Sequence, residues 1–268
     1  MGIETSSLTV KIYHYLLEKN IHIRFVPCES LIENLRLYKD LMEIENIKKA
    51  VAVTDKAWRF LKNNLKLGLT EEEISFKIEH FMRSEKADDI AWRPIIVAIS
   101  EHSANPHHLP THKKVKKGDL ILIDMGAKIN GYISDMTRIF FTDTLTSLQF
   151  KVYTAVLKAQ EKALQTIKLK TPSVKVDEET RKIMVKHGFK KESEQYPHNL
   201  GHGVGLEIHE KPSLGMFTPD TIENNMVFTI EPAIYLQNNF GVRIEDTVMM
   251  NNGKLEILTK SPKDIVIL

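Results

Sequence analysis

Five side chains that can bind a metal ion lie in separate short motifs of this 268-residue chain. They are Asp124, Asp135, His202, Glu231 and Glu245. Because the set combines carboxylates with one imidazole and no thiolate, it favours divalent ions such as Mn²⁺, Co²⁺ or Zn²⁺ over a cysteine-rich zinc site. Two ions that share carboxylate ligands can lie about 3.5–4 Å apart and hold a hydroxide between them. The set therefore predicts a two-metal hydrolase.

Asp124, taken alone, has a simpler explanation than metal binding. Asp124 lies in the apolar segment Leu122–Gly126, and an aspartate beside a glycine more often caps or turns the chain than binds metal. Asp135 lies within Ser134–Arg138, which we expect to be a strand. Burial of a carboxylate in mid-strand is unfavourable unless a cation compensates for its charge, so the second aspartate raises the probability of a metal site.

The other three candidates are ambiguous in the same way. His202 lies between glycines, where a histidine is usually structural or solvated, although the glycines permit a close approach of the backbone. Glu231 and Glu245 each interrupt an apolar strand segment and fit charged positions on an edge strand. The conjunction of all five, together with a local excess of histidines, favours chemistry over these separate explanations.

The first half of the chain predicts helices followed by strands. Apolar residues recur at helical spacing from Leu41 and stop at Gly68. Thr70 and Glu73 form the pattern of a capping box, which predicts a second helix to about Lys86. The turn Asn130–Gly131 is expected to pair the strands that carry the two aspartates in antiparallel fashion. The strands expected in this half are Pro94–Ile99, Leu120–Met125 and Ser134–Thr142.

The second half repeats this order. We expect helices at Leu145–Ile167 and Val176–His187, and then strands at Met226–Ile230, Ala233–Leu236 and Gly241–Met249. Two similar halves of helices and strands predict an α+β architecture.

The first residues carry no chemical motif. A short helix is expected at Leu8–Leu17 and a strand at Ile21–Val26. Residues 1–34 are therefore interpreted as an appendage, and residues 35–268 as the catalytic domain.

Composition excludes several classes of function. The net charge of +2 is spread over the chain without a basic stripe, so we expect no nucleic-acid partner. Since no apolar run approaches the roughly 20 residues that cross a bilayer, no membrane role is expected. The single cysteine, Cys28, cannot form an intrachain disulfide, and a cytoplasmic location is the default expectation.

The motifs together resemble the pita-bread metallopeptidases (M24-type), and within that family the Xaa-Pro aminopeptidase and prolidase branch. The resemblance spans about Leu35 to the C-terminus and covers all five candidate ligands. It implies a pita-bread fold with a curved antiparallel sheet, and two divalent ions, most often Mn²⁺. The segments that carry it are Gly118–Gly126, Gly131–Arg138, Gly201–Pro212, Phe228–Pro232 and Gly241–Asp246.

The resemblance also implies a role for each ligand. Asp124 would be a terminal ligand of one ion, and His202 and Glu231 terminal ligands of the other. Asp135 and Glu245 would bridge the two ions. Glu231 would also shuttle protons.

Four further residues gain expected roles from the resemblance. His107 and His209 match histidines that contact substrate and stabilise the tetrahedral intermediate. His198 and Arg243 match residues that line the substrate site. We therefore treat His107, His209 and Glu231 as catalytic candidates, and His107, His198, His209 and Arg243 as substrate-binding candidates.

The implied activity is metal-dependent hydrolysis of an N-terminal Xaa-Pro bond by a hydroxide that bridges two ions, and the implied substrate is a peptide with proline at its second position. An Xaa-Pro aminopeptidase is the main interpretation and an Xaa-Pro dipeptidase (prolidase) the alternative. A methionine aminopeptidase is disfavoured by the short gap between Glu231 and Glu245. A non-catalytic binding module of the same fold is disfavoured because all five ligands are present.

The chain also departs from the family pattern. His102 and Asn105 replace residues usual in the family before the first site histidine, which affects the expected substrate loop. Family members usually carry a complete extra N-terminal domain, so residues 1–34 are interpreted as its remnant. The sequence leaves the oligomeric state open, with a homodimer as one option.

Overall fold

The computed structural model describes residues 1–5, 7–19, 22–194 and 197–268. Contacts between residues divide the chain into two compact units, Met1–Arg36 and Leu37–Leu268. The interpretation of residues 1–34 as the remnant of an N-terminal domain stays a prediction.

The first unit is small. Strand β1 (Gly2–Ile3) pairs in parallel with β2 (Val26–Pro27), and helices α1 (Val10–Lys19) and α2 (Leu31–Arg36) complete the unit. The helix expected at Leu8–Leu17 is therefore found two residues later. The expected strand reaches the sheet only at Val26, and its first residue, Ile21, lies outside the described residues.

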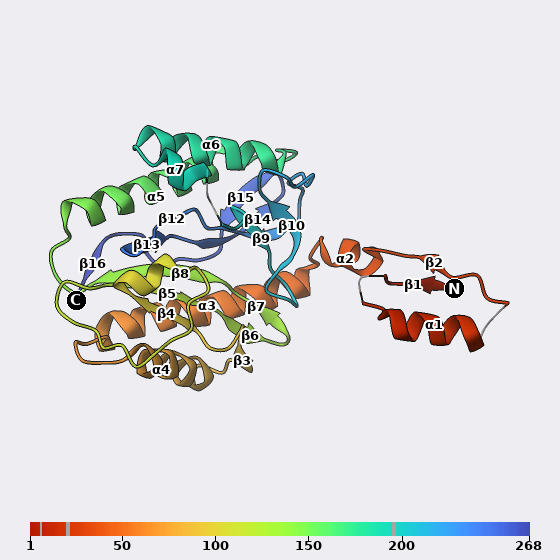
Figure 1. Cartoon of the computed structure of the whole chain (residues 1–268), viewed down its shortest axis with the longest axis horizontal. Helices are drawn as coiled ribbons and strands as arrows, with labels where there is room; N and C mark the ends of the chain where they lie inside the picture. The colour runs from red at the N-terminus through yellow and green to blue at the C-terminus, as the bar shows by residue number, and fades with distance from the viewer. Residues whose placement is uncertain (6, 20–21, 195–196) are drawn as a thin grey trace. The chain divides into compact units, whose positions relative to one another are not determined.

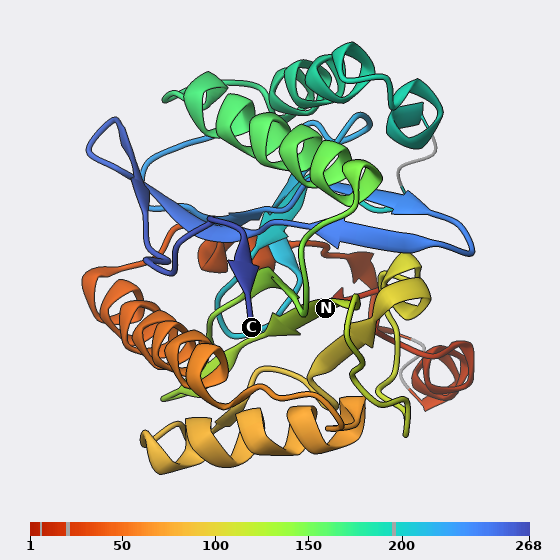
Figure 2. The same ribbon diagram turned by 90° about the vertical axis from the view of Figure 1, so that its left-hand side faces the viewer.

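The second unit places its sheets between two layers of helices (Figures 1 and 2). Helices α3 (Leu41–Asn64) and α4 (Glu71–Ser84) cover one side. The other side is covered by α5 (Ser147–Thr166), α6 (Ser173–Lys186) and the short α7 (Lys190–Glu194). The four longer helices correspond to those expected from the sequence.

Capping boxes fix the start of three of these helices. Thr70 Oγ1 accepts the backbone N–H of Glu73, and the Glu73 carboxylate accepts the N–H of Thr70, as the sequence predicted. Asp40 with Glu43 begins α3 in the same way, and Thr146 with Gln149 begins α5. Such reciprocal bonds satisfy backbone donors that the first turn of a helix leaves unpaired.

The first-half sheet has the order β16-β8-β5-β4. Its antiparallel strands are β4 (Ile96–Ile99), β5 (Leu120–Met125) and β8 (Met136–Phe141), and β16 (Val266–Ile267) joins β8 in parallel. Between β4 and β5 the chain forms the 3-10 helix η1 (Ser100–Ala104) and a loop.

The expected reversal at Asn130–Gly131 is present. Both residues have positive φ, 49° and 85°, which two-residue hairpins of this hand require. The turn joins β6 (Ala127–Ile129) to β7 (Tyr132–Ile133), and β3 (Asp89–Ile90) pairs with β6. As predicted, β5 and β8 consequently pair in antiparallel fashion.

The second half contains a five-stranded sheet and a separate two-stranded one. The larger sheet has the order β10-β9-β11-β14-β15 and the smaller one consists of β12 and β13. Their bounds are β9 (Gly201–Gly203), β10 (Glu210–Leu214), β11 (Val227–Ile230), β12 (Ala233–Leu236), β13 (Phe240–Arg243), β14 (Asp246–Asn251) and β15 (Lys254–Ile257).

The prediction of one continuous strand near the C-terminus is wrong. The segment Gly241–Met249 was expected to be a single strand, but it divides into β13 and β14 at Ile244 and Glu245. Here the chain leaves the partner β12 and joins β11, a change of sheet that the apolar pattern does not encode.

The two faces of β5 contact different cores. Ile121, Ile123 and Met125 pack in the cluster that includes α3 and α4, whereas Leu120 and Leu122 pack in the cluster that includes α5. Because side chains alternate along a strand, Asp124 points to the same face as Leu120 and Leu122. This face turns toward the second half of the molecule, where β13 also packs.

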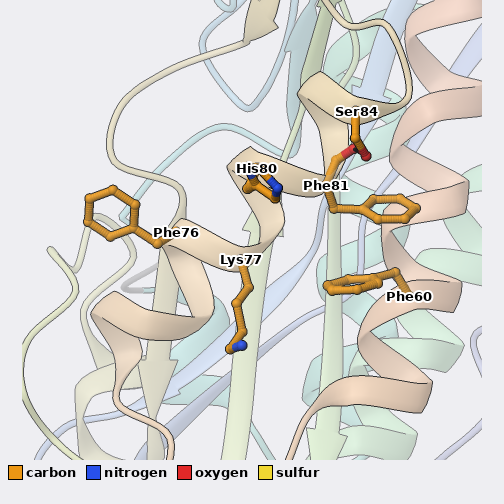
Figure 3. Close-up of a pocket in the computed structure, with 6 residues that line it drawn as sticks. All are labelled: Phe60, Phe76, Lys77, His80, Phe81 and Ser84. Atoms are coloured by element: carbon orange, nitrogen blue, oxygen red, sulfur yellow. Dashed lines mark hydrogen bonds between the residues drawn. The ribbon is translucent and has the colours of Figure 1, made fainter.

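A surface hollow of about 450 Å³ lies on helices α3 and α4 (Figure 3). Inside it the rings of Phe60 and Phe81 stack with centroids 4.4 Å apart. None of its lining residues is a candidate for metal or substrate binding; they are Phe60, Phe76, Lys77, His80, Phe81 and Ser84. In the part of the chain that the structure describes, no helix is long and apolar enough to span a membrane.

Replacement of Phe140 by alanine is expected to destabilise the unit strongly. Phe140 is fully buried and stacks on Trp58, with ring centroids 6.2 Å apart. Phe140→Ala should lower the free energy of unfolding by about 3–5 kcal/mol in urea titrations. The control Phe76→Ala removes a ring that is 73% exposed and should have little effect. Equal losses in the two variants would contradict the packing described here.

Candidate metal centre

The five candidate ligands lie where strands of both halves end or meet. Asp124 is near the end of β5, and Asp135 lies directly before β8. His202 is in β9, Glu231 follows β11, and Glu245 lies between β13 and β14. The expectation that Asp135 lies in mid-strand is therefore wrong, although its side chain is buried as expected.

The structure brings the five side chains together. Donor atoms of Asp135, His202 and Glu245 all lie within 4.8 Å of one another. His202 Nε2 is 3.6 Å from Asp135 Oδ2 and 3.1 Å from Glu231 Oε1. The charge of Asp124 also acts on Asp135 and on Glu245. Residues from positions 124 to 245 thus form one cluster.

Three carboxylate oxygens of this cluster show that its donors fit metal ions. Asp124 Oδ1, Asp135 Oδ1 and Glu245 Oε1 are buried and have no hydrogen-bond partner among the described residues. The three residues are only 8%, 3% and 1% exposed. Since buried polar atoms are almost always paired, three unpaired acidic oxygens in one place are what a cation site needs. Oxygen donors with one imidazole suit borderline divalent ions.

Electrostatics supports the same conclusion. Burial and the neighbouring charges of Glu245 and Asp124 raise the pKa of Asp135 well above its usual value. Burial and the charges of Glu231 and Asp124 raise the pKa of Glu245 in the same way. Burial is also the main reason that the pKa of Asp124 is raised, although Arg243 opposes the shift. The carboxylates repel one another in a site of low polarity.

His202 and Glu231 form the most favourable contact of the cluster. Burial opposes both charges, but their mutual hydrogen bond and the neighbouring charges together outweigh it, so the pKa of His202 is raised and that of Glu231 falls to about 2. His202 Nδ1 is 3.1 Å from the backbone oxygen of Gly203 and is assigned as its donor, which leaves Nε2 directed at the carboxylates.

The glycines beside His202 allow its strand to lie close to its neighbours. A Cβ atom at Gly201 would clash with the backbone oxygen of Thr229 in β11, and one at Gly203 would clash with the backbone of Lys211 in β10. The close backbone approach expected from the sequence is therefore present.

Threonine hydroxyls orient the ligands, and the sequence analysis did not identify them. Thr137 Oγ1 donates to Glu245 Oε2 over 2.6 Å, and Thr229 Oγ1 donates to Glu231 Oε1 over 3.2 Å. The only signal for Thr137 was its position two residues after Asp135. In the register of the sheet it pairs with Asp124 and points to the same face.

Arg243 is buried and connects one ligand to the substrate candidates. Its Nη2 donates to Asp124 Oδ2 over 2.6 Å, and its Nη1 donates to the hydroxyl oxygen of Tyr235 over 2.7 Å. The Tyr235 hydroxyl is in turn 3.0 Å from His198 Nε2. Tyr235 was missed because it is an ordinary strand residue in the sequence, and only the pairing of β12 with β13 brings it near Arg243.

The three other histidines surround the same space. The rings of His209 and His202 have centroids 4.3 Å apart. Burial lowers the pKa values of both His198 and His209, and the positive charge of His107 contributes to the same direction. His107 itself is exposed on the loop after η1. The structure thus brings His198, His209 and Arg243 together with the ligands, whereas His107 is connected to them only through its charge.

Buried carboxylates with unpaired oxygens, one imidazole and a rim of histidines define a metal-dependent hydrolase site. The model of metallopeptidase family M24 matches residues 45–252. The chain belongs to this family.

Known relatives cover the whole chain. The Xaa-Pro dipeptidase of Pyrococcus furiosus is 35% identical over 266 residues, which are 99% of this chain and 75% of the relative. An Xaa-Pro dipeptidase structure from Bacillus anthracis is 35% identical, with a TM-score of 0.94 and coverage of 100% and 74%. The structure of an X-Pro aminopeptidase from Thermotoga maritima is 32% identical, with a TM-score of 0.90 and coverage of 100% and 75%.

These comparisons confirm the predicted family, the α+β pita-bread fold and a metal-dependent peptidase. Membership in a metallopeptidase family also implies divalent metal ions. The identity of the ion, the role of each site residue, a homodimer and a cytoplasmic location stay predictions.

Metal affinity is expected to increase with pH. Because the pKa values of Asp135 and Glu245 are raised, both carboxyls keep their protons to a higher pH than free acids do, and a bound cation must displace those protons. Mn²⁺ should therefore bind more tightly at about pH 8 than at about pH 5.5 and release protons as it binds. Calorimetry in buffers of different ionisation enthalpy measures both effects. Equal affinity at the two pH values without proton release would contradict the raised pKa values.

Proposed function

We propose that the chain is an Xaa-Pro dipeptidase that hydrolyses the bond before a C-terminal proline with the help of two divalent ions. The observation that carries the proposal is the convergence of Asp124, Asp135 and Glu245, each with one buried oxygen that has no partner among the described residues. The substrate class is supported by relatives from two species that are named Xaa-Pro dipeptidase.

The ligand roles in this proposal are those that the resemblance to the family implies, and the clustering of Asp135, His202 and Glu245 supports them. Asp135 and Glu245 would hold both ions, Asp124 would complete one site, and His202 with Glu231 would complete the other. Mn²⁺ is the ion that we favour, with Co²⁺ or Zn²⁺ as alternatives. Ions bound there supply the Lewis-acid chemistry of metal-assisted hydrolysis.

Glu231 is suited to move a proton. The resemblance to the family implies that Glu231 accepts a proton from the attacking water. Because its pKa is about 2, the carboxylate is ionised near neutral pH and would hold that proton only weakly. One oxygen faces His202, and Oε2 is 3.8 Å from His198 Nδ1. The departing proline nitrogen is an amine that needs a proton, and Glu231 can return the one it accepted.

The histidines at the rim are suited to bind the substrate. Their lowered pKa values keep His198 and His209 neutral near pH 7, so each ring can donate one hydrogen bond without adding a charge. We assign His107 and His209 to the carbonyl oxygen that becomes negative during attack, which is where a donor accelerates hydrolysis most. We assign His198 and Arg243 to the wall of the substrate site.

A dedicated proline site has a physical reason. The Xaa-Pro bond is a tertiary amide without an N–H, so an enzyme that holds its substrate by that donor loses a contact at proline. A pocket formed for the proline ring supplies binding energy in place of the missing hydrogen bond.

An Xaa-Pro aminopeptidase that acts on longer peptides is the second candidate. It is favoured by the similarity to the structure named X-Pro aminopeptidase, which covers 100% of this chain. The two candidates share the metal site and differ in what lies beyond the proline.

Peptide length distinguishes them. With Mn²⁺ bound, we expect Xaa-Pro dipeptides to be cleaved with a kcat/KM at least about tenfold above that for Xaa-Pro-Yaa. The proline of Xaa-Pro-Yaa has no free carboxylate, and the loss of one contact to that group would cost about 1.4 kcal/mol. Met-Ala-Yaa should not be cleaved. Faster cleavage of Xaa-Pro-Yaa would favour the aminopeptidase, and no cleavage together with no bound metal would favour a non-catalytic module.

Replacement of a bridging ligand should remove both metal and activity. Asp135→Asn replaces a charged oxygen by an amide, and kcat/KM for an Xaa-Pro dipeptide should fall by about 10³-fold, or about 4 kcal/mol. The control Asp177→Asn changes a buried carboxylate of α6 that pairs with Arg181 and should keep the metal and the activity. Metal content by elemental analysis and initial rates are the measurements. Full activity of Asp135→Asn would exclude the proposed ligand set.

A further inference from the structure

A second group of metal-capable side chains lies under the loop that carries His107. Glu71, the first residue of α4, is completely buried, and its carboxylate lies within hydrogen-bond distance of His102 and His108. His102 Nδ1 is 2.8 Å from Glu71 Oε1, and His108 Nε2 is 2.9 Å from Oε2. The two imidazole rings also pack on each other, with centroids 4.3 Å apart.

Glu71 also binds both ends of this loop. The backbone N–H of Ile99, which ends β4, donates to Oε1 over 2.8 Å. At the other end, the backbone N–H and the hydroxyl of Thr111 donate to Oε2 over 2.9 and 2.7 Å. One carboxylate thus collects donors from positions 99, 102, 108 and 111, which enclose His107.

The opposite side of the loop is fixed to the second half of the molecule. Ser103 in η1 accepts the backbone N–H of Gly241 in β13 over 2.8 Å. A Cβ atom at Gly241 would clash with the backbone oxygen of Ser103, so the two segments lie in close contact. Strand β13 also carries Arg243. The loop is therefore held between Glu71 on one side and the strand of a site residue on the other.

The arrangement is that of a hydrogen-bond network and not of a metal site. Glu71, His102 and His108 have a donor set that suits a metal ion. Both Glu71 oxygens, however, already accept hydrogen bonds, two at Oε1 and three at Oε2. A carboxylate offers about four lone-pair positions, so no position is left for a cation. This differs from the metal centre, where three oxygens have no partner among the described residues.

Hydrogen bonding also outweighs the effect of burial on Glu71. Burial alone would raise its pKa, but the bonds from His108, Ile99 and Thr111 lower it. The group is therefore ionised near neutral pH, and an ionised acceptor holds its donors more firmly than a neutral one.

We propose that Glu71 is a positioning residue that, through His102 and His108, holds the loop of residues 99–111 so that His107 faces the metal centre. The inference rests on the proposed function for the role of His107, but the network itself does not. It gives His102, a departure from the family pattern, a role in fixing the substrate loop.

Hydrogen exchange of the full-length, Mn²⁺-loaded protein tests the network without any substrate. In Glu71→Gln the side-chain NH₂ group replaces one acceptor oxygen and faces two or three of the former donors in either orientation. Because those hydrogen bonds are lost, the backbone N–H groups of residues 99–111 should exchange at least about tenfold faster than in the wild type. Asp177→Asn, the same isosteric change at a buried carboxylate of α6, should leave their exchange unchanged. Unchanged exchange of this loop in Glu71→Gln would overturn the proposal.

Matched histidine variants test the effect on catalysis and remain informative if Glu71→Gln does not fold. His108→Gln and His102→Asn keep an N–H near the position of the original donor, whereas His108→Leu and His102→Leu remove it. With metal content equal to the wild type, the leucine variants should lose about tenfold to a hundredfold in kcat/KM for an Xaa-Pro dipeptide, and the amide variants should recover most of this loss.

The two readouts separate the possible failures. A wild-type protein that cleaves no Xaa-Pro peptide, but whose loop exchanges faster in Glu71→Gln, contradicts the proposed function and retains the network. Equal kcat/KM in the leucine and amide variants, or Zn²⁺ bound to the Glu71 cluster in a crystal of the wild type, would overturn the positioning role.

Discussion

The repulsion between buried carboxylates is the constraint on which the rest of the structure depends. Asp124, Asp135, Glu231 and Glu245 converge in a site of low polarity, where ionised groups of like charge are strongly unfavourable. Arg243 and His202 compensate for part of this charge through direct contacts. The oxygens left without partners among the described residues are available to divalent cations, which would offset the remaining charge.

The scaffold places charged groups where an apolar core would normally lie. The ligands come from strand ends and junctions beside the apolar clusters, while His107 and His209 of the rim are exposed. The hydroxyls of Thr137 and Thr229 then set the direction of two carboxylates. Hydrogen bonds of this kind, from groups that do not themselves bind the metal, orient the ligands before an ion binds.

The features that the sequence predicted depend on local patterns, and those it did not predict depend on distant contacts. The capping box at Thr70, the turn at Asn130 and the long helices are specified by residues a few positions apart. The bonds from Thr137 to Glu245 and from Arg243 to Asp124 join positions more than a hundred residues apart and leave no periodic signal. The ligand set was predictable from the residue types in its motifs, but the role of each ligand followed only from the resemblance to a family.

The division of the ligands between the two halves has a consequence for the order of folding. The first two carboxylates lie on or beside β5 and β8, which precede helices α5 and α6 in the chain, whereas the other three ligands follow those helices. Contacts so distant in sequence require the closure of long loops, which slows folding. During synthesis, a nascent chain therefore carries Asp124 and Asp135 as an incomplete acidic patch until Glu245 has emerged from the ribosome.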